Sequence, residues 1–391
     1  MKFDFDKVVD RHGTKCLKYD FAKERGRSDD MLPLWVADMD FQTAPGIQKS
    51  LSDAVAHGIY GYSEGKDDYF QAAAGWYEKH FGWKVEKEWL IKTPGVVFAL
   101  AMAVKAYTKE GDAVLLQQPV YYPFSEVITD NHRRLINSPL QQIDGHYEIN
   151  FEEFEQKIVE ENVKLFLMCS PHNPVGRVWK EWEVRKIGDI CLKHNVLVVS
   201  DEIHSDFTYG ENIHHVFASL DEKYAAITTT CTAPSKTFNI AGLQISNIWI
   251  SNPELRARFR AEVTAAGYSQ VNLMGLVACQ AAYETGEEWL KELKIYLEGN
   301  LDYVRTFLKE NLPEIKLTEP EGTYLLWLDF KSLGMKEEQL KDLVENKAKL
   351  WLDSGAMFGP DGEGFERINI ACPREILKQA LTQLAESVHD R

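Results

Sequence analysis

The stretch "PSKTFNIAGL" (residues 234–243) decides the fold, because it places a lysine directly after a predicted buried strand. That strand is "AAITTTCT" (residues 225–232), and Lys236 therefore follows a strand end among small, hydroxylated and apolar neighbours. Burial disfavours the charged form of a lysine and leaves its amine as a nucleophile that can condense with a carbonyl. A surface lysine at a strand end is the more common case, so the rest of the chain has to decide between the two interpretations.

Strand and helix patterns alternate through the middle of the chain, which is typical of a parallel sheet covered by helices. The apolar run at 163–171, the helical spacing at 181–195 and the apolar run at 196–203 predict one βαβ unit. Further strands are predicted at 112–119, 225–232 and 246–251. The sequence therefore predicts an α/β fold whose sheet occupies roughly the middle two thirds of the chain.

The pattern changes after about Gly286, where a long charged helix is predicted at 287–312. Strands at 322–330 and 366–372 and a final helix follow, which predicts a second, smaller α+β domain. We expect a large domain at 46–286, a small domain at 287–391, and an N-terminal segment, 1–45, that packs with the small domain.

Composition excludes several classes of function. The net charge of −16, without a clustered basic face, argues against nucleic acid as a partner. The six cysteines are scattered and form no C-x-x-C pair, which favours a reducing cytoplasm over a disulfide framework or a zinc ribbon. The histidines match no standard zinc signature, so we expect no metal. The charged N-terminus and the absence of a long apolar run predict neither export nor a membrane anchor.

Polar residues follow three of the predicted strands. Ligands of open α/β sheets bind beyond the carboxyl ends of the strands, and Asn173, Asp201 and His204 are expected there. Gly95 directly precedes an apolar, alanine-rich helical run, whose first backbone amides are free to bind a phosphate. Each feature also has an ordinary explanation as a turn, a solvated strand end or a helix entry.

Taken together with Lys236, these residues are the parts needed to hold pyridoxal phosphate (PLP). The lysine would form a Schiff base, and Asp201 would keep the pyridine nitrogen protonated so that the ring accepts electrons. Tyr121, in "PVYYPF" (residues 119–124), would stack on the face of the ring. The joint order of these features favours a PLP site over the separate explanations.

Four motifs together resemble the fold type I PLP enzymes, the aspartate aminotransferase-like fold, over essentially the whole chain. They are "NPVG" (173–176), "SDEIHSD" (200–206), "SKTFNIAGL" (235–243) and "FERINIACPR" (365–374). Four other stretches resemble more narrowly the MalY/PatB-type cystathionine β-lyases: "FDFDKVVDRHGTKCLKYD" (3–20), "VADMDFQTAP" (36–45), "GIYGYSEG" (58–65) and "LKIYLEGNL" (293–301). The resemblance implies a large, mostly parallel sheet domain and a smaller α+β domain.

The resemblance also implies how the pyridoxal ring is held. It assigns Lys236 to the Schiff base and Asp201 to the pyridine nitrogen. Asn173 would hydrogen-bond the phenolic oxygen, with His204 nearby where many relatives have tyrosine. Tyr121 would stack on the ring, so the implied catalytic set is Lys236, Asp201 and Tyr121.

The phosphate of the cofactor is implied to bind to hydroxyls and backbone amides, at Thr232, Ser235, Gly95, Val96 and Val97. Tyr62 matches a tyrosine that relatives lend to the phosphate of the neighbouring subunit, which implies a homodimer with shared active sites. Many transaminases of this fold carry an arginine eight residues after the lysine, where this sequence has Gln244. The phosphate should therefore depend more on amides and hydroxyls.

The substrate is implied to be a small molecule, an amino acid. Arg367 would hold its α-carboxylate by a bidentate fork, for which the planar guanidinium is suited, and the alternative is a surface salt bridge. The resemblance adds Asn173, Tyr324 and Asp38 to the substrate site. It favours β-elimination from cystathionine, cysteine or another S-substituted cysteine. An aminotransferase of the same fold is the alternative, and a regulator that binds a partner protein is a third reading, since fold does not fix function.

Overall fold

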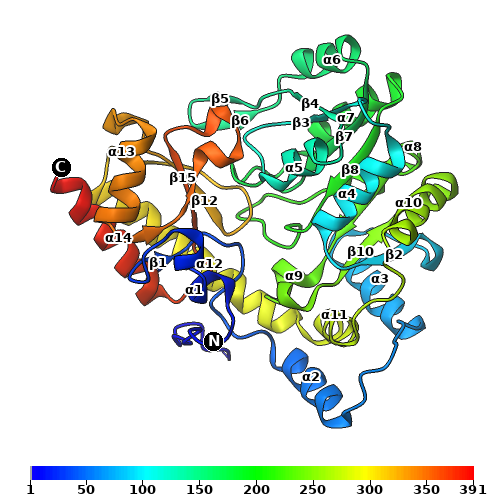
Figure 1. The fold of residues 1–391 in the computed structure, drawn as a ribbon, viewed down its shortest axis with the longest axis horizontal. Coiled ribbons are helices and arrows are strands. Elements are labelled where there is room, and N and C mark those ends of the chain that lie inside the picture. The colour runs from blue at the N-terminus through cyan, green and yellow to red at the C-terminus, as the bar shows by residue number, and fades with distance from the viewer. Residues whose placement is uncertain (1) are drawn as a thin grey trace.

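The computed structural model describes residues 2–391, and its centre is a seven-stranded sheet (Figure 1). The strand order is β2-β10-β9-β8-β7-β3-β4. β3, β4, β7, β8 and β9 run parallel, whereas β10 is antiparallel to both of its neighbours. The strands are β2 (Leu90–Thr93), β3 (Ala113–Leu116), β4 (Arg134–Asn137), β7 (Val163–Cys169), β8 (Leu197–Asp201), β9 (Thr228–Thr232) and β10 (Ser246–Trp249). The predicted α/β class and the mostly parallel sheet are confirmed.

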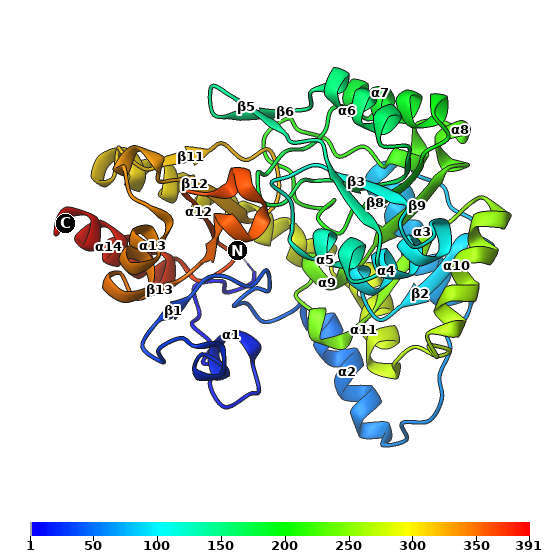
Figure 2. The same cartoon turned by 45° about the horizontal axis from the view of Figure 1, so that its top comes forward.

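Helices cover both faces of this sheet (Figure 2), and the alternation of side chains along β7 shows why. Leu165, Leu167 and Cys169 join the apolar cluster with α4, α5 and α10. Phe166 and Met168 point to the opposite face and join the cluster with α6, α7 and α8. Those helices are α4 (Val96–Tyr107), α5 (Pro123–Thr129), α6 (Phe151–Glu160), α7 (Glu181–Lys193), α8 (Glu222–Ala225) and α10 (Pro253–Ala265).

A second, four-stranded sheet is formed late in the chain, in the order β11-β12-β15-β14. Its strands are antiparallel where they pair: β11 (Lys316–Thr318), β12 (Leu325–Asp329), β14 (Asp353–Ser354) and β15 (Phe365–Asn369). The helices around it are α12 (Glu287–Asn311), α13 (Glu337–Lys341) and α14 (Arg374–His389). The early strand β1 (Leu32–Pro33) pairs with β13 (Leu350–Trp351), so the N-terminal segment lies against this part of the chain. The predicted domain boundaries stay predictions.

The remaining elements lie around these two sheets. α2 and α3 pack on α11, and α9 follows β9 directly. Their bounds are α1 (Leu17–Asp20), α2 (Pro45–His57), α3 (Asp67–Phe81), α9 (Pro234–Thr237), α11 (Leu273–Thr285), β5 (Gln141–Ile143) and β6 (His146–Glu148). Within residues 2–391 no helix combines the length and the apolar character needed to cross a membrane. The same residues contain no group of three or more metal-binding side chains, and all six cysteines are buried and free.

Candidate active site

Three neighbouring parallel strands bring the predicted site residues to one edge of the large sheet. Cys169 of β7 is the register partner of Asp201, which is in turn the partner of Cys231 in β9. Asn173 and Lys236 follow within a few residues of these strand ends. Because the strands are parallel, their carboxyl ends meet at the same edge, and the three predicted residues lie there together.

Lys236 lies in the short helix α9, and its ammonium has a neutral partner. Its Nζ donates a hydrogen bond to the carbonyl oxygen of Ala37 at 2.8 Å. Burial lowers the pKa of Lys236 to about 8, with the charge of Arg367 acting in the same direction and the carboxylates of Asp38 and Asp201 opposing it. The neutral, nucleophilic form of this amine is therefore far more populated near neutral pH than that of an ordinary lysine.

Asp201 is buried at the end of β8 and has no cationic side chain hydrogen-bonded to it among residues 2–391. Its Oδ1 accepts a hydrogen bond from the backbone N–H of Ile203 at 3.1 Å. Burial raises the pKa of this carboxyl to about 7. Such a carboxyl favours a protonated nitrogen brought beside it, because a cation would compensate the cost of its buried charge.

His204 is buried close to the lysine, and its ring is held neutral. Burial lowers its pKa to about 3, and the positive charges of Lys236 and Arg367 act in the same direction. Its ring lies edge-on to Tyr324, with the centroids 5.9 Å apart, and its Nδ1 has no hydrogen-bond partner among the described residues. A neutral imidazole has one nitrogen that donates a hydrogen bond and one that accepts it. The unused nitrogen of His204 can therefore form a hydrogen bond with a bound group.

Arg367 connects the small sheet to the ends of the large one. It lies in β15 and is 2 % exposed. Its Nη1 donates to Oδ1 of Asn173 at 3.0 Å, and its Nη2 donates to the carbonyl oxygen of Trp35 at 2.8 Å and to the carboxylate of Asp353. Its Nε has no partner within residues 2–391. Arg367 is thus a buried ion-pair partner, which excludes the alternative of a surface salt bridge.

The irregular segment at 35–39, which follows β1, supplies backbone oxygens to this site. The carbonyl oxygen of Ala37 also accepts from the hydroxyl of Tyr324 at 3.0 Å. The amide of Asn369 donates to the carbonyls of Val36 and Asp38, at 2.7 and 2.6 Å. This segment therefore ties the lysine of α9 to the small sheet.

Asp38 lies at the edge of the same region. One of its oxygens accepts from Nη2 of Arg11 at 2.5 Å. Its Oδ1 is buried, lies 4.0 Å from the ammonium of Lys18 and has no hydrogen-bond partner among residues 2–391. Asp38 therefore carries a negative charge near Lys236 and Tyr324, whose pKa values it raises.

Tyr121 lies between the two large-domain clusters, beside Asn173. Its backbone N–H donates to the carbonyl oxygen of Asn173 at 3.0 Å. Burial raises the pKa of its hydroxyl, and the charges of Arg367, Asp353 and Asp201 act on it as well. The ring is therefore placed among the charged residues of the site, as the sequence predicts.

The helix α4 begins without a side-chain cap, unlike several helices of the same sheet. Asparagine side chains accept hydrogen bonds from first-turn amides of α6, α10 and α11, whereas the N-cap of α4 is Gly95 and no side chain caps it. A Cβ added at Gly95 would meet no atom within 4 Å, so Gly95 borders open space. Val96 is buried and Val97 is 39 % exposed at this helix start. Uncapped amides at a helix start can bind an anion, and the phosphate site at Gly95, Val96 and Val97 stays a prediction.

The two hydroxyls predicted at the phosphate differ in their surroundings. Ser235 makes a single long contact, 3.5 Å from Oγ to the carbonyl of Ile245. The hydroxyl of Thr232 donates to the carbonyl of Asn247 at 2.8 Å and accepts from the indole N–H of Trp249 at 3.0 Å. A hydroxyl has only one hydrogen, so Thr232 has none left for a phosphate oxygen. The prediction of Thr232 as a phosphate ligand is therefore corrected.

Tyr62 is far from any packed surroundings within the chain. It is 94 % exposed and lies in an irregular segment between α2 and α3 that extends away from the body (Figures 1 and 2). Gln244, where many transaminases carry an arginine, is also exposed. Neither side chain is buried within the described chain.

Two residues of the site were missed by the sequence interpretation. Asp353 pairs with Arg367 across neighbouring strands, and no motif marked it. The carbonyl of Ala37 carries no side-chain signal, although the "VADMDF" stretch around it was singled out. The register of β14 against β15 is the signal that identifies Asp353.

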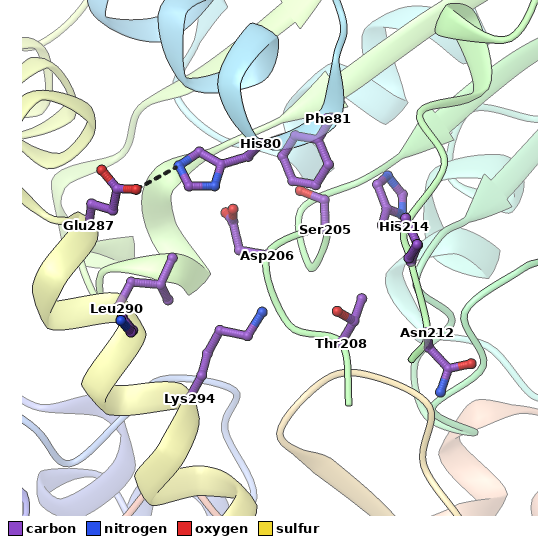
Figure 3. Close-up of a pocket in the computed structure, with 12 residues that line it drawn as sticks. His80, Phe81, Ser205, Asp206, Thr208, Asn212, His214, Glu287, Leu290 and Lys294 are labelled. Atoms are coloured by element: carbon purple, nitrogen blue, oxygen red, sulfur yellow. Dashed lines mark ion pairs between the residues drawn. The ribbon is translucent and has the colours of Figure 1, made fainter. Parts of the chain in front are cut away.

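A separate cavity of about 430 Å³ lies between the end of α3, the segment after β8 and the start of α12 (Figure 3). None of the predicted site residues lines it. Asp206 on its wall accepts hydrogen bonds from Thr237 at 2.6 Å and from the indole N–H of Trp76 at 3.1 Å, which fixes the residue after Lys236. In Figure 3 the ammonium of Lys294 points into this cavity, and burial lowers its pKa.

The fold and this site agree with the comparisons to known proteins. Residues 30–384 match the family described as "Aminotransferase class I and II", and the chain belongs to that family. It is 43% identical to cystathionine beta-lyase PatB of Bacillus subtilis, over 97% of this chain and 98% of that protein. It is 33% identical to protein MalY of Escherichia coli, over 99% of both chains. These relatives confirm the MalY/PatB branch indicated by the sequence motifs.

Solved structures show the same similarity in three dimensions. Cystalysin from Treponema denticola, a structure that contains a pyridoxal 5'-phosphate cofactor, is 38% identical, covers 100% of both chains and has a TM-score of 0.96. The PLP-bound C-S lyase from Staphylococcus hominis is 33% identical, with a TM-score of 0.93 over 99% of this chain and 98% of that chain. The fold type predicted from the sequence is therefore confirmed.

Proposed function

We propose that this chain is a PLP-dependent carbon-sulfur β-lyase that cleaves L-cystathionine or a related S-substituted cysteine. The overall reaction consumes one water and yields a thiol, pyruvate and ammonia. The observation that carries the proposal is the convergence of Lys236, Asp201, Asn173 and Arg367 at one end of the sheet. Full-length similarity to PatB, at 43% identity, supports lyase chemistry at that site.

The residues present fit pyridoxal 5'-phosphate. Lys236 supplies an amine with a lowered pKa, and Asp201 is a buried carboxyl without a cationic hydrogen-bond partner among residues 2–391. The uncapped start of α4, with Gly95, offers free amides and open space to a phosphate, and Ser235 adds a hydroxyl. Asn173 would contact the phenolic oxygen with His204 nearby, and Tyr121 would pack against the ring.

Bound PLP supplies an electron sink for the pair released when the α-proton of the substrate leaves. Lys236 would hold the cofactor through its Nζ, and once that amine is free it would take the α-proton of the substrate. Asp201 would keep the pyridine nitrogen protonated. The electron pair of the broken Cβ–S bond would leave with the sulfur as a thiolate, and the proton held on Nζ of Lys236 would pass to that sulfur to give the thiol.

Substrate binding is assigned to Arg367, with Asn173, Tyr324 and Asp38 around it. The guanidinium is charge-complementary to an α-carboxylate, and Asn173 already contacts it. Asp38 offers a buried oxygen without a hydrogen-bond partner in the described chain, which suits the α-ammonium of an amino acid. Tyr324 is held against Ala37 and so borders the same space.

Thiol release from cystathionine without any added keto acid tests the proposal. We expect homocysteine and pyruvate to form in equal amounts, because elimination needs no second substrate. The measurement is colorimetric thiol release beside enzymatic assay of pyruvate. An aminotransferase remains the second candidate, because loss of the α-proton is common to both reactions. If no thiol is released in the absence of a keto acid, that result would favour the aminotransferase. A regulatory role in addition to catalysis is left open by fold alone.

We further propose that the enzyme is a homodimer in which the partner subunit's Tyr62 contacts the cofactor phosphate. Supporting this, the segment between α2 and α3 exposes three large side chains close together in the sequence: Ile59 at 68 %, Tyr60 at 60 % and Tyr62 at 94 %. Monomeric proteins rarely expose such clusters without a binding role. The cytoplasmic location stays a prediction.

Mixing two inactive variants tests the shared site. Tyr62→Phe and Lys236→Ala each impair their own chain's contribution, but a heterodimer contains one site with both native residues. We expect up to about half of wild-type activity per heterodimer, because one of its two sites is intact. Activity that stays at the level of the separate parents in purified heterodimers would contradict a contribution of Tyr62 across the interface.

A further inference from the structure

The guanidinium of Arg367 is already occupied by groups of its own chain. A carboxylate can accept two parallel hydrogen bonds from a guanidinium at only two of its edges. One edge is formed by Nε and Nη2, and the other by Nη1 and Nη2. Both edges include Nη2, and Nη2 donates to the carbonyl of Trp35 and to the carboxylate of Asp353. A bidentate contact to a substrate therefore requires one of these two partners to leave.

Asp353 is the partner that can move. Trp35 contributes a backbone oxygen, and its segment is held by pairing of the adjoining strand β1 with β13. Asp353 contributes a side chain that can rotate, and it lies directly opposite Arg367 in the register of β14 and β15. It is 3 % exposed, so its charge is costly to bury and depends on Arg367 for compensation.

A cavity of about 600 Å³ adjoins Asp353 on the side of the N-terminal segment. Arg25 and Arg27 line it together with Asp353. Arg27 pairs with Glu345 at 2.9 Å, and its Nε is buried without a hydrogen-bond partner among residues 2–391. Glu126, Glu345, Glu366 and Lys341 complete the charged lining of this cavity. The cavity thus offers room to a displaced carboxylate, and it offers the guanidinium groups of Arg25 and Arg27 as new partners.

We propose that Asp353 is a specificity-determining residue that competes with the substrate α-carboxylate for Arg367. In the free enzyme the side chain of Asp353 occupies Nη2, and on binding the substrate carboxylate takes that position while Asp353 turns toward Arg25 and Arg27. The inference rests on the proposed role of Arg367 as the carboxylate clamp. Its consequence is that Asp353 weakens the binding of every carboxylate ligand and favours those that form additional contacts.

Titration of the holoenzyme with propionate and with propionamide tests this competition. The two probes have nearly the same shape and differ in charge, and isothermal titration measures their binding without any turnover. Asp353→Asn should tighten propionate binding by at least about fivefold, a typical coupling between two sites, and should leave propionamide binding unchanged. Asp353→Ala should do the same, because removal of the charge is what matters. Glu366 in β15 is a buried carboxyl that makes no hydrogen bond with Arg367, so it serves as the matched control. Glu366→Gln should leave the affinity for both probes at the wild-type value.

The outcomes separate this inference from the role of Arg367 itself. Propionate binding that is unchanged or weaker in both Asp353 variants would overturn the competition. Arg367→Lys should lose propionate binding if the clamp is correct. Wild-type propionate affinity in Arg367→Lys would overturn the clamp, and with it the competition.

Discussion

Lys236→Ala should lower kcat for thiol release by at least about 10³-fold, since a positioned general base alone contributes 10²- to 10⁴-fold. The variant also loses the amine that binds the cofactor covalently. Borohydride reduction of the wild-type holoenzyme should fix the cofactor on the peptide that contains Lys236, and the variant should retain none after denaturation. The carbonyl of Ala37 keeps its hydrogen bond from Tyr324, so the fold should survive the change.

Lys294→Ala is the matched control for this experiment. Burial lowers the pKa of Lys294 as it does that of Lys236, but Lys294 lines the separate cavity between α3 and α12. The control should keep wild-type turnover and wild-type trapping of the cofactor. Undiminished trapping in Lys236→Ala would show that another amine holds the cofactor.

Arg367→Lys should reduce kcat/KM for cystathionine by about 10- to 100-fold, mainly through KM. The lysine keeps a positive charge beside Asp353 but cannot form the two-point contact of a guanidinium, and hydrogen bonds to charged groups are worth about 1.5–3 kcal/mol. Arg367→Ala should cost more and should also destabilise the fold, because it leaves Asp353 buried without its partner. Steady-state kinetics with thermal unfolding of the same samples separates the two effects.

Arg374→Lys serves as the control for the arginine experiment. Arg374 is the last residue of the same motif, but its side chain donates a hydrogen bond to Asn300 on α12 and none to the site residues. The KM of Arg374→Lys for cystathionine should stay at the wild-type value. A KM for Arg367→Lys equal to that of the control would contradict the assignment of Arg367 to the substrate carboxylate.

Long apolar runs made most of the large sheet predictable. The strands β7 and β8 are buried on both faces, so their sequences read as continuous apolar stretches. β2 and β4 were not predicted, because they are the two edge strands of the sheet and neither is fully buried, so neither has a continuous apolar sequence. A short edge strand is specified by its neighbour rather than by its own pattern.

The site was predictable where a residue follows a strand or belongs to a motif. Asn173 and Arg367 are 194 residues apart in the sequence, yet their side chains are hydrogen-bonded. Each belongs to a motif: Asn173 follows the end of β7, and Arg367 lies in β15 of the small sheet. Thr232 was assigned wrongly because the direction of its side chain depends on the alternation along β9 and on its partners in β10. Asp353 depends on cross-strand register, which no motif in the sequence marks. The role of Tyr62 comes from the family resemblance alone and would depend on a second chain.

The fate of the amino nitrogen tests the central claim most directly. The enzyme is given cystathionine labelled with ¹⁵N on the cysteine-derived amine, with 2-oxoglutarate present in excess, and the products are analysed by mass spectrometry. A β-lyase should release the label as ammonia, in amounts equal to homocysteine and pyruvate, whether or not the keto acid is present. Label recovered in glutamate, with turnover that requires 2-oxoglutarate and releases no thiol, would contradict the lyase account and establish an aminotransferase.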